Sequence, residues 1–279
     1  MKATILTDST CDLPSELVAR LGLQVVPLYV LFGTESFRDG VTLSNADFFR
    51  KLTSSPHHPG TSQPTPEDFL QIYRRIPGPI FSMHLASSLS GTCSSASQAV
   101  RLMGEEGARV RVWDSESVTA ALGLLAMAAW EAAEEGQDLD GIETHVRQVR
   151  QDLKLYFTLE TLDHLAKGGR IGRAQALLGG LLKIRPILSF ADQSVVPLAK
   201  TFGFEQALNR IVDLAAKDHR LKPLRRLFVI HGAAPQAAER LEQKVRERIP
   251  GDFEILRTVI GAVIGTHVGP GAAGLAYHS

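Results

Sequence analysis

The stretch HLASSLSGTCSSA, residues 84–96, gathers six hydroxyl side chains and one thiol directly after the apolar run PIFSM. The apolar run predicts a buried strand, and the residues after it predict a helix with Ser90 or Thr92 as its N-cap. Gly91 allows another group to approach the backbone closely. Free N–H groups and the positive end of the helix dipole favour an anion at such a turn. Because capping needs only one or two hydroxyls, the stretch indicates an anion-binding loop.

Three further stretches combine hydroxyl side chains with helix-start or glycine-rich signals. They are residues 7–14 (TDSTCDLP), 60–69 (GTSQPTPEDF) and 264–274 (IGTHVGPGAAG). The second contains Thr61 and Ser62, and the third brings Thr266 and His267 into a predicted glycine-rich turn. In an open α/β sheet the loops that follow the strands gather at one edge, where ligands bind. Hydroxyls from separate loops would meet there.

The common catalytic signatures are missing from the sequence. There is no phosphate-binding loop, nucleophile elbow, zinc-protease helix or pair of C-x-x-C motifs. GPGAAG at residues 269–274 fits G-x-G-x-x-G, but only five residues follow it, so the rest of a dinucleotide-binding unit has no room. His57 and His58 lie among prolines without a further ligand nearby, and we predict no metal site.

The segment HLAKGGRIGRAQ, residues 164–175, carries cations at regular spacing. Lys167, Arg170 and Arg173 recur every three residues through a Gly-Gly break. This spacing can place the cations on one side of a loop that leads into a helix. They form either a solvated basic face or a docking patch for a partner or a phosphate.

Composition restricts the classes of function. The chain has 279 residues, 30 Lys plus Arg and 30 Asp plus Glu, so nothing in its net charge favours nucleic acid or an anionic membrane. No run reaches 18 apolar residues, and we expect no stable membrane insertion. Two cysteines and the absence of a signal peptide at the start predict a reduced, cytoplasmic protein.

Apolar runs alternate with helical patterns along the chain, which predicts βαβ units and a mainly parallel sheet flanked by helices. The predicted strands are residues 3–6, 23–32, 79–84, 109–114, 153–159, 185–190, 194–200, 225–232 and 252–260. The predicted helices are residues 14–22, 45–53, 66–75, 92–103, 117–135, 139–152, 173–182, 203–219 and 235–248.

Residues 185–200 interrupt this alternation, because two apolar runs flank the short polar turn ADQ and predict an antiparallel hairpin. We therefore expect an α/β protein of two domains. Residues 1–158 would form an N-terminal α/β domain with a mainly parallel sheet. Residues 159–279 would form a C-terminal α+β domain with a mixed sheet.

Five motifs occur in the order and approximate spacing of a known family. They are TDSTCDLP, TSQPTPEDF, SSLSGTCSSA, LETLDHLAKGGRIGRAQALLGGLLKIRPIL and GTHVGPGAAGL. Over essentially its whole length the chain resembles the DegV family of bacterial lipid-binding proteins. The resemblance implies one long-chain fatty acid in a tunnel between two domains and no other cofactor. It also implies a non-catalytic role, in which a separate ATP-using fatty acid kinase subunit phosphorylates the carboxylate that this protein presents.

The resemblance also implies site residues. The carboxylate would be held by Thr61 or Ser62, by Ser90 with its neighbours, and by His267. The full ligand-binding set is Thr61, Ser62, Ser90, Gly91, Thr92, Arg170 and His267, and the kinase-docking set is Lys167, Arg170 and Arg173. Ser88 stands where many members carry glycine, which leaves Ser87, Ser88 and Ser90 open as the ligand contact. Ser90 is preferred because LSGT matches the family most closely.

Elementary energetics agree with these roles. About 14 buried methylenes at about 0.8 kcal/mol each contribute on the order of 10 kcal/mol before association costs are subtracted. Hydroxyls and helix amides satisfy a buried carboxylate without the fixed cation that would reduce its nucleophilicity toward ATP. Residues 120–130 and 176–188 are candidate tunnel walls.

Two other functions stay open. One is a stand-alone phosphoryl-transfer or hydrolytic enzyme that uses Asp8, Asp12 and His267. The other is a regulatory or degradation-linked module, suggested by the family's name alone, although the sequence contains no DNA-binding motif to support it.

Overall fold

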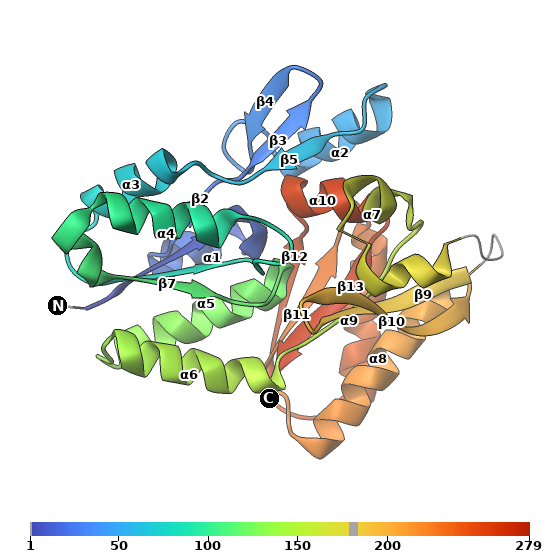
Figure 1. Cartoon of the computed structure of the whole chain (residues 1–279). Coiled ribbons are helices and arrows are strands. Elements are labelled where there is room, and N and C mark those ends of the chain that lie inside the picture. Colours follow the sequence, from blue (N-terminus) through green and yellow to red (C-terminus); the bar gives the residue numbers. More distant parts are fainter. Residues whose placement is uncertain (1, 179–183) are drawn as a thin grey trace.

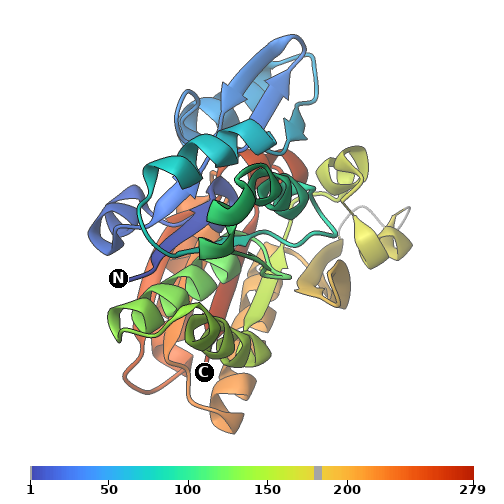
Figure 2. The same cartoon turned by 60° about the vertical axis from the view of Figure 1, so that its left-hand side comes forward.

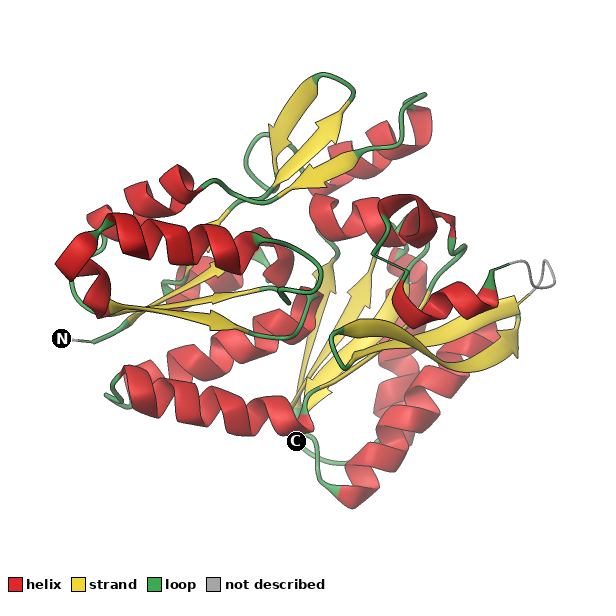
Figure 3. Cartoon of the chain, in the orientation of Figure 1, coloured by secondary structure: helices red, strands yellow, loops and turns green. Residues whose placement is uncertain are grey.

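The computed structural model describes residues 2–178 and 184–279, which form two α/β halves (Figure 1, Figure 3). The first half contains a four-stranded parallel sheet with the strand order β2-β1-β6-β7. Its strands are β1 (Thr4–Asp8), β2 (Gln24–Val26), β6 (Ile80–His84) and β7 (Val110–Asp114). β6 is buried at every position, as a strand of a parallel sheet with helices on both faces must be.

Helices cover both faces of this sheet. They are α3 (Pro66–Arg75), α4 (Thr92–Leu102), α5 (Thr119–Glu134) and α6 (Leu139–Asp152), and the shorter α1 (Ser15–Leu21) follows β1. α3 and α4 pack together on one face, and α5 and α6 pack together on the other (Figure 1). The start of α3 follows from its sequence, because Pro66 occupies the first turn and Thr65 forms a capping box with Asp68.

The second half is built on a six-stranded mixed sheet with the order β10-β9-β8-β13-β11-β12. Its strands are β8 (Lys154–Thr158), β9 (Ile184–Ala191), β10 (Ser194–Phe202), β11 (Arg226–His231), β12 (Glu254–Val259) and β13 (Ala273–His278). Two amphipathic helices, α8 (Phe204–Leu221) and α9 (Pro235–Arg248), pack on it. The predicted fold class, a mainly parallel sheet followed by an α+β unit with a mixed sheet, is confirmed.

Helix α5 lies between the two sheets (Figure 2). It contacts β1 and β6 of the first sheet and β11 and β13 of the second. Its sequence is apolar on all sides, and its residues from Thr119 to Ala129 are all buried. A helix that is apolar all round must be covered all round, and the two sheets together supply that cover.

A small antiparallel sheet with the order β4-β3-β5 completes the first half. It contains β3 (Tyr29–Phe32), β4 (Glu35–Arg38) and β5 (Gly60–Ser62), and α2 (Asn45–Ser54) connects β4 to β5. The single strand predicted over residues 23–32 is therefore wrong. Pro27 cannot donate to a sheet ladder, so the chain breaks there and its two parts join different sheets.

The predicted β9–β10 hairpin is confirmed. Ala191 lies opposite Ser194, and the two residues between them, Asp192 and Gln193, both have positive φ, at 48° and 56°. Two central residues with positive φ are the signature of a tight type I′ connection.

The C-terminal segment differs from the glycine-rich turn predicted over residues 264–274. Thr266 and His267 lie on a short helix, α10 (Ala262–Val268), and β13 occupies the interior of the six-stranded sheet. Only the residues between them form a turn, with positive φ at Gly269 and Gly271. Small residues hid both elements, because alanine and glycine give no amphipathic period even where, as in β13, every position is buried.

Two smaller differences concern the middle of the chain. The sequence did not indicate α7 (Asp163–Gly168). Of the helix predicted over residues 173–182, the described part is a short 3₁₀ helix, η3 (Gly172–Leu177), and residues 179–182 lie outside the described residues. β8 pairs with β9 and β13, which puts it in the second sheet although the expected domain boundary at residue 158 assigned it to the first domain. By sheet membership the change comes between α6 and β8.

Two aspartates of the first half hold the start of α10. Asp12 accepts hydrogen bonds from Gly261 N at 2.9 Å and from the Thr119 hydroxyl at 2.6 Å, and Asp39 accepts one from Ala262 N at 3.0 Å. Burial raises the pKa of Asp12 well above its ordinary value and raises that of Asp39 to about 6.

Across the described residues, no helix has both the length and the apolar character to cross a bilayer.

We predict that Gly123→Ala in α5 destabilises the protein, although alanine is intrinsically more favourable than glycine inside a helix by about 1 kcal/mol. An added methyl group would lie 2.8 Å from the Cys11 carbonyl oxygen and 2.7 Å from Leu13 Cδ2, and such overpacking costs about 1–3 kcal/mol. Urea unfolding followed by circular dichroism should show a lower free energy of unfolding. Gly141→Ala in α6, which meets mainly the Gln137 side chain, is the control and should change stability little. A more stable Gly123→Ala variant would contradict the close packing of α5.

Candidate functional site

A cavity lies between the two halves and encloses about 1130 Å³ of space between protein atoms, including its opening to solvent. Its apolar wall comes from both halves and consists of Leu28, Leu85, Leu89, Val118, Leu155, Phe157, Leu165, Phe190, Val195, Ile230, Ile260, Val263, Ile264, Val268, Ala272 and Ala273. Its polar wall consists of Thr61, Ser62, Gln63, Ser90, Thr119, Arg170 and His267, with Gly91 and Gly274 beside them. The cavity is thus largely apolar with a limited set of polar groups, as small-molecule sites usually are.

Thr61 and His267 meet in this wall, one from each half. β5 carries Thr61, α10 carries His267, and Thr61 Oγ1 lies 3.1 Å from His267 Nε2. Gly168 of α7 lies against the imidazole ring, where any side chain would collide with Nδ1. Burial, assisted by Arg170 and His58, lowers the pKa of His267 to about 4. His267 is therefore neutral near pH 7 and presents one N–H donor.

The hydroxyl-rich loop approaches the cavity from β6. Ser90 lines the cavity, and its hydroxyl lies 2.9 Å from that of Thr92, which is buried behind it. The N-cap of α4 is Gly91, and no side chain of the described residues caps the helix, so the prediction that Ser90 or Thr92 is the cap is wrong. Within the described part of the chain, no side chain accepts a hydrogen bond at the cap of α4, so its first N–H groups stay available to a ligand.

Gln63 is a cavity residue that sequence reasoning missed. Its amide lies over Gly91, where a side chain would collide with it, so the close approach predicted at Gly91 is confirmed with Gln63 as the approaching group. Gln63 Nε2 donates to Ser95 Oγ at 3.1 Å, which fixes the amide against α4. The signal was its position directly after Ser62 in the TSQP motif.

Only Ser90 of the three candidate serines lines the cavity. The backbone N of Ser87 donates to the Asp114 carboxylate at 3.2 Å. Ser88 Oγ donates to the Gln193 carbonyl at 2.7 Å, and so ties this loop to the β9–β10 turn of the other half. Both side chains are exposed outside the cavity.

The three predicted docking cations occupy different environments. Arg170 lines the cavity while remaining exposed, and donates to the carbonyls of Gly168 at 2.8 Å and Leu89 at 3.3 Å. Lys167 is exposed and lies outside the cavity wall. Arg173 is also exposed and pairs with Asp192 at 3.2 Å. Only Arg170 therefore faces both the cavity and solvent.

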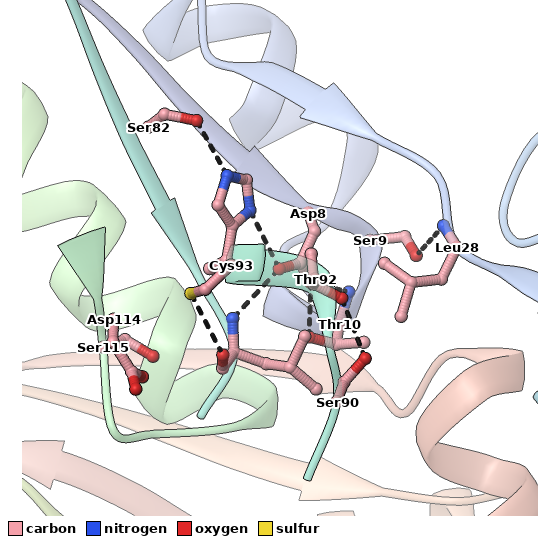
Figure 4. A network of polar contacts seen from close by, with 12 residues as sticks. Asp8, Ser9, Thr10, Leu28, Ser82, Ser90, Thr92, Cys93, Asp114 and Ser115 are labelled. Atoms are coloured by element: carbon pink, nitrogen blue, oxygen red, sulfur yellow. Dashed lines mark hydrogen bonds and ion pairs between the residues drawn. The ribbon is translucent and has the colours of Figure 1, made fainter. Parts of the chain in front are cut away.

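Asp8 has a structural role, because its carboxylate belongs to a buried hydrogen-bond network (Figure 4). Its carboxylate accepts hydrogen bonds from Thr10 N and Leu85 N, both at 3.0 Å, and lies 3.1 Å from His84 Nδ1. His84 Nε2 is 2.7 Å from Ser82 Oγ. All these side chains except Leu85, which is 3% exposed, are 0% exposed, so the network ties the loop after β1 to the end of β6 and no substrate reaches it.

The residues of the enzyme alternative are not brought together. Asp8 bonds within the network above, Asp12 bonds Gly261 and Thr119, and His267 bonds Thr61. None of the three lies in hydrogen-bond contact with another in the described part of the chain. Over residues 2–178 and 184–279, no group of three or more His, Cys, Asp or Glu side chains could hold a metal ion.

The described residues of the predicted tunnel walls do not line the cavity. Residues 120–130 pack as core between the two sheets, and the described residues of 176–188 lie outside the cavity wall. Residues 179–183 lie outside the described part of the chain. The wall comes instead from single side chains of many elements, such as Phe157 of β8 and Phe190 of β9.

A family model described as an uncharacterised protein of the DegV family matches residues 2–279. The chain belongs to the DegV family. Four of the motifs on which the resemblance rested contribute residues to the cavity wall; they span residues 61–69, 87–96, 159–188 and 265–275. The fifth, residues 7–14, contains the buried Asp8 and Asp12.

Relatives of this DegV-family chain come from several bacteria. It is 36% identical over 280 residues to a DegV domain-containing protein of Listeria innocua, covering 99% of this chain and 98% of the relative. A solved structure described as fatty acid binding of a DegV family protein from Thermus thermophilus matches it with a TM-score of 0.92, at 34% identity and 100% coverage of both chains. The crystal structure of DegV from Bacillus subtilis, described as a fatty acid binding protein, matches with a TM-score of 0.89, at 32% identity over 100% of this chain and 99% of that one.

We predict that His267→Gln reduces the loss of stability in acid. The pKa of His267 is about 4 in the folded protein and ordinarily 6.5, so its stabilising share is complete above pH 6.5 and is lost as pH falls toward 4. Between about pH 7 and about pH 4.5 the variant's free energy of unfolding should fall by about 2 kcal/mol less than that of the wild type. Urea unfolding at the two pH values measures this difference. His57→Gln, which changes an exposed histidine, is the control; equal acid losses in both variants would refute the assignment.

Proposed function

We propose that this protein binds one long-chain fatty acid and presents its carboxylate to a separate ATP-dependent fatty acid kinase subunit in the cytoplasm. The observation that carries the proposal is a largely apolar cavity whose polar wall contains the neutral pair Thr61 and His267. The two DegV-family proteins described as fatty acid binding share the whole fold with this chain.

The carboxylate is proposed to lie against Thr61 and His267, with Ser62, Ser90 and the uncapped start of α4 at Gly91 as further donors. Thr92 acts from behind by orienting the Ser90 hydroxyl, at 2.9 Å. These groups satisfy a carboxylate by hydrogen bonds, which a buried anion needs. Arg170 also lines the cavity but donates to two backbone carbonyls, so we propose that the carboxylate has no fixed ion pair and that its oxygen stays nucleophilic toward a phosphoryl donor.

The tail is proposed to follow the apolar wall into the protein. Each methylene that leaves water contributes about 0.8 kcal/mol, so the tail dominates affinity and the head group sets orientation. Ligand retention and carboxylate reactivity therefore depend on different residues.

Arg170 is proposed as the link to the kinase subunit, with Lys167 and Arg173 beside it. Its guanidinium is held by the Leu89 and Gly168 carbonyls at the exposed edge of the cavity, next to the proposed head group. A kinase that docks there would reach the carboxylate. No observation favours the stand-alone enzyme, because Asp8 and Asp12 are structurally engaged.

Mass spectrometry of organic extracts tests the function itself. Protein purified from a bacterial host should release long-chain fatty acid in a ratio near one per chain, and delipidated protein should bind it again. Protein that neither carries nor rebinds fatty acid would overturn the proposal.

We predict that the double variant Thr61→Ala/Ser90→Ala loses phosphorylation far more than lipid retention. Removing positioned donors lowers the rate of kinase-dependent phosphorylation by about a hundredfold, by analogy with the loss of an oxyanion donor. Retention falls by less than about tenfold because the tail supplies most of the affinity. Ser87→Ala, outside the cavity, is the control. Equal losses of rate and retention would contradict this division.

We predict that Arg170→Ala raises the concentration of protein needed for half-maximal kinase rate by about tenfold and lowers fatty acid affinity much less, because the tail supplies most of that affinity. One charged contact across an interface typically carries this much binding energy. Arg173→Ala, which removes a cation already paired with Asp192, is the matched control with a smaller expected effect. If Arg170→Ala leaves the concentration for half-maximal kinase rate unchanged, Arg170 is an ordinary solvated residue and does not contact the kinase.

A further inference from the structure

Two histidines meet beside the cavity, and the binding site proposed above does not use them. His58 lies in the loop between α2 and β5 of the first half, and His164 lies on α7 of the second. Their ring centroids are 5.4 Å apart with an interplanar angle of 41°. The ring pair is therefore a direct contact between the two halves.

Both sides of this contact lead directly into the cavity wall. A short distance after His58 the chain enters β5, where Thr61 and Ser62 line the cavity. On the other side, Leu165, the next residue after His164, also lines the cavity. α7 also packs on α10, and the His164 ring fills the space over Gly269, where any side chain would collide with it. A displacement of α7 from the His58 loop would therefore open the wall.

The surroundings of the two rings are poor in acceptors for an added proton. Within the described residues, His58 Nε2 and His164 Nδ1 are buried without a hydrogen-bond partner. The charge of Lys167 acts on both rings, and the rings lie against each other.

The other charged groups near the two rings do not compensate for this lack of acceptors. Asp163, the residue before His164 on α7, is the acidic group that acts on His164. On α10, the charge of His58 acts on His267, whose pKa Arg170 also lowers. Burial, together with Lys167, lowers the pKa of both His58 and His164 below the ordinary 6.5. The pair is thus stable while neutral and has little to compensate two positive charges.

We propose that the His58–His164 contact is an acid-sensitive latch, which holds α7 against the His58 loop while both rings are neutral and releases it when both are protonated. The contact is complete above the ordinary histidine pKa and is lost as pH falls through the lower values of the folded protein. Release would expose the cavity beside Thr61 and Leu165. The latch itself depends only on the protein, whereas its use in ligand exchange rests on the proposed function.

Amide hydrogen exchange tests the latch without a ligand. Protection of α7, corrected for the intrinsic rate and compared with α9, should fall about tenfold between about pH 7.5 and about pH 5 in the wild type. His58→Gln and His164→Gln each remove one of the two rings that gain a positive charge in acid, one from each half of the protein. Both variants should therefore keep α7 protected in acid. His57→Gln, in the same loop, should behave as the wild type. Retained α9 protection shows that each variant is folded.

Two results would overturn the latch. One is wild-type protection of α7 that changes with pH only as α9 does. The other is an acid loss of α7 protection that is the same in the two glutamine variants as in the wild type.

Release of a long-chain alcohol, which has no titrating head group, extends the test to the ligand. Its release rate should rise about tenfold over the same pH range in the wild type and stay constant in His164→Gln. Opening of α7 without any binding of fatty acid or alcohol would support the latch and count against the proposed function.

Discussion

The structure depends on the need to cover α5 on every side. A helix whose residues are apolar around its whole circumference is stable only where each face finds an apolar partner. Neither sheet could provide this alone, and α5 accordingly contacts strands of both. One shared helix thus joins the two halves by burial and holds them close enough to enclose a cavity.

Polar contacts then refine what burial has joined. Asp12 and Asp39 of the first half receive the first N–H groups of α10, whose other end carries His267 to Thr61. Ser88 and Arg170 reach carbonyl groups of the opposite half at the rim of the cavity. The cavity wall is therefore a joint product of both halves, and its polar part lies where their loops meet.

Much of the fold was predictable, and the failures have physical reasons. Apolar runs and capping residues indicate strands such as β6 and helices such as α3, so their predicted bounds agree closely with the observed ones. β13 and α10 were missed because alanine and glycine carry little periodic signal, although both elements are buried. The site motifs were found by their order along the chain, but Gln63 and the wall residue Phe157 belong to no pattern. Their roles arise from packing between distant elements, which no local window contains.

The buried chain Ser82, His84 and Asp8 has a wider consequence for reading structures. Its hydroxyl, imidazole and carboxylate stand in the order used by serine hydrolases, with separations of 2.7 Å and 3.1 Å. By these two separations alone the three groups resemble a hydrolase triad. The feature that separates them from one is accessibility, since a nucleophile at 0% exposure has no substrate. Burial thus belongs in the definition of a catalytic template as much as distance does.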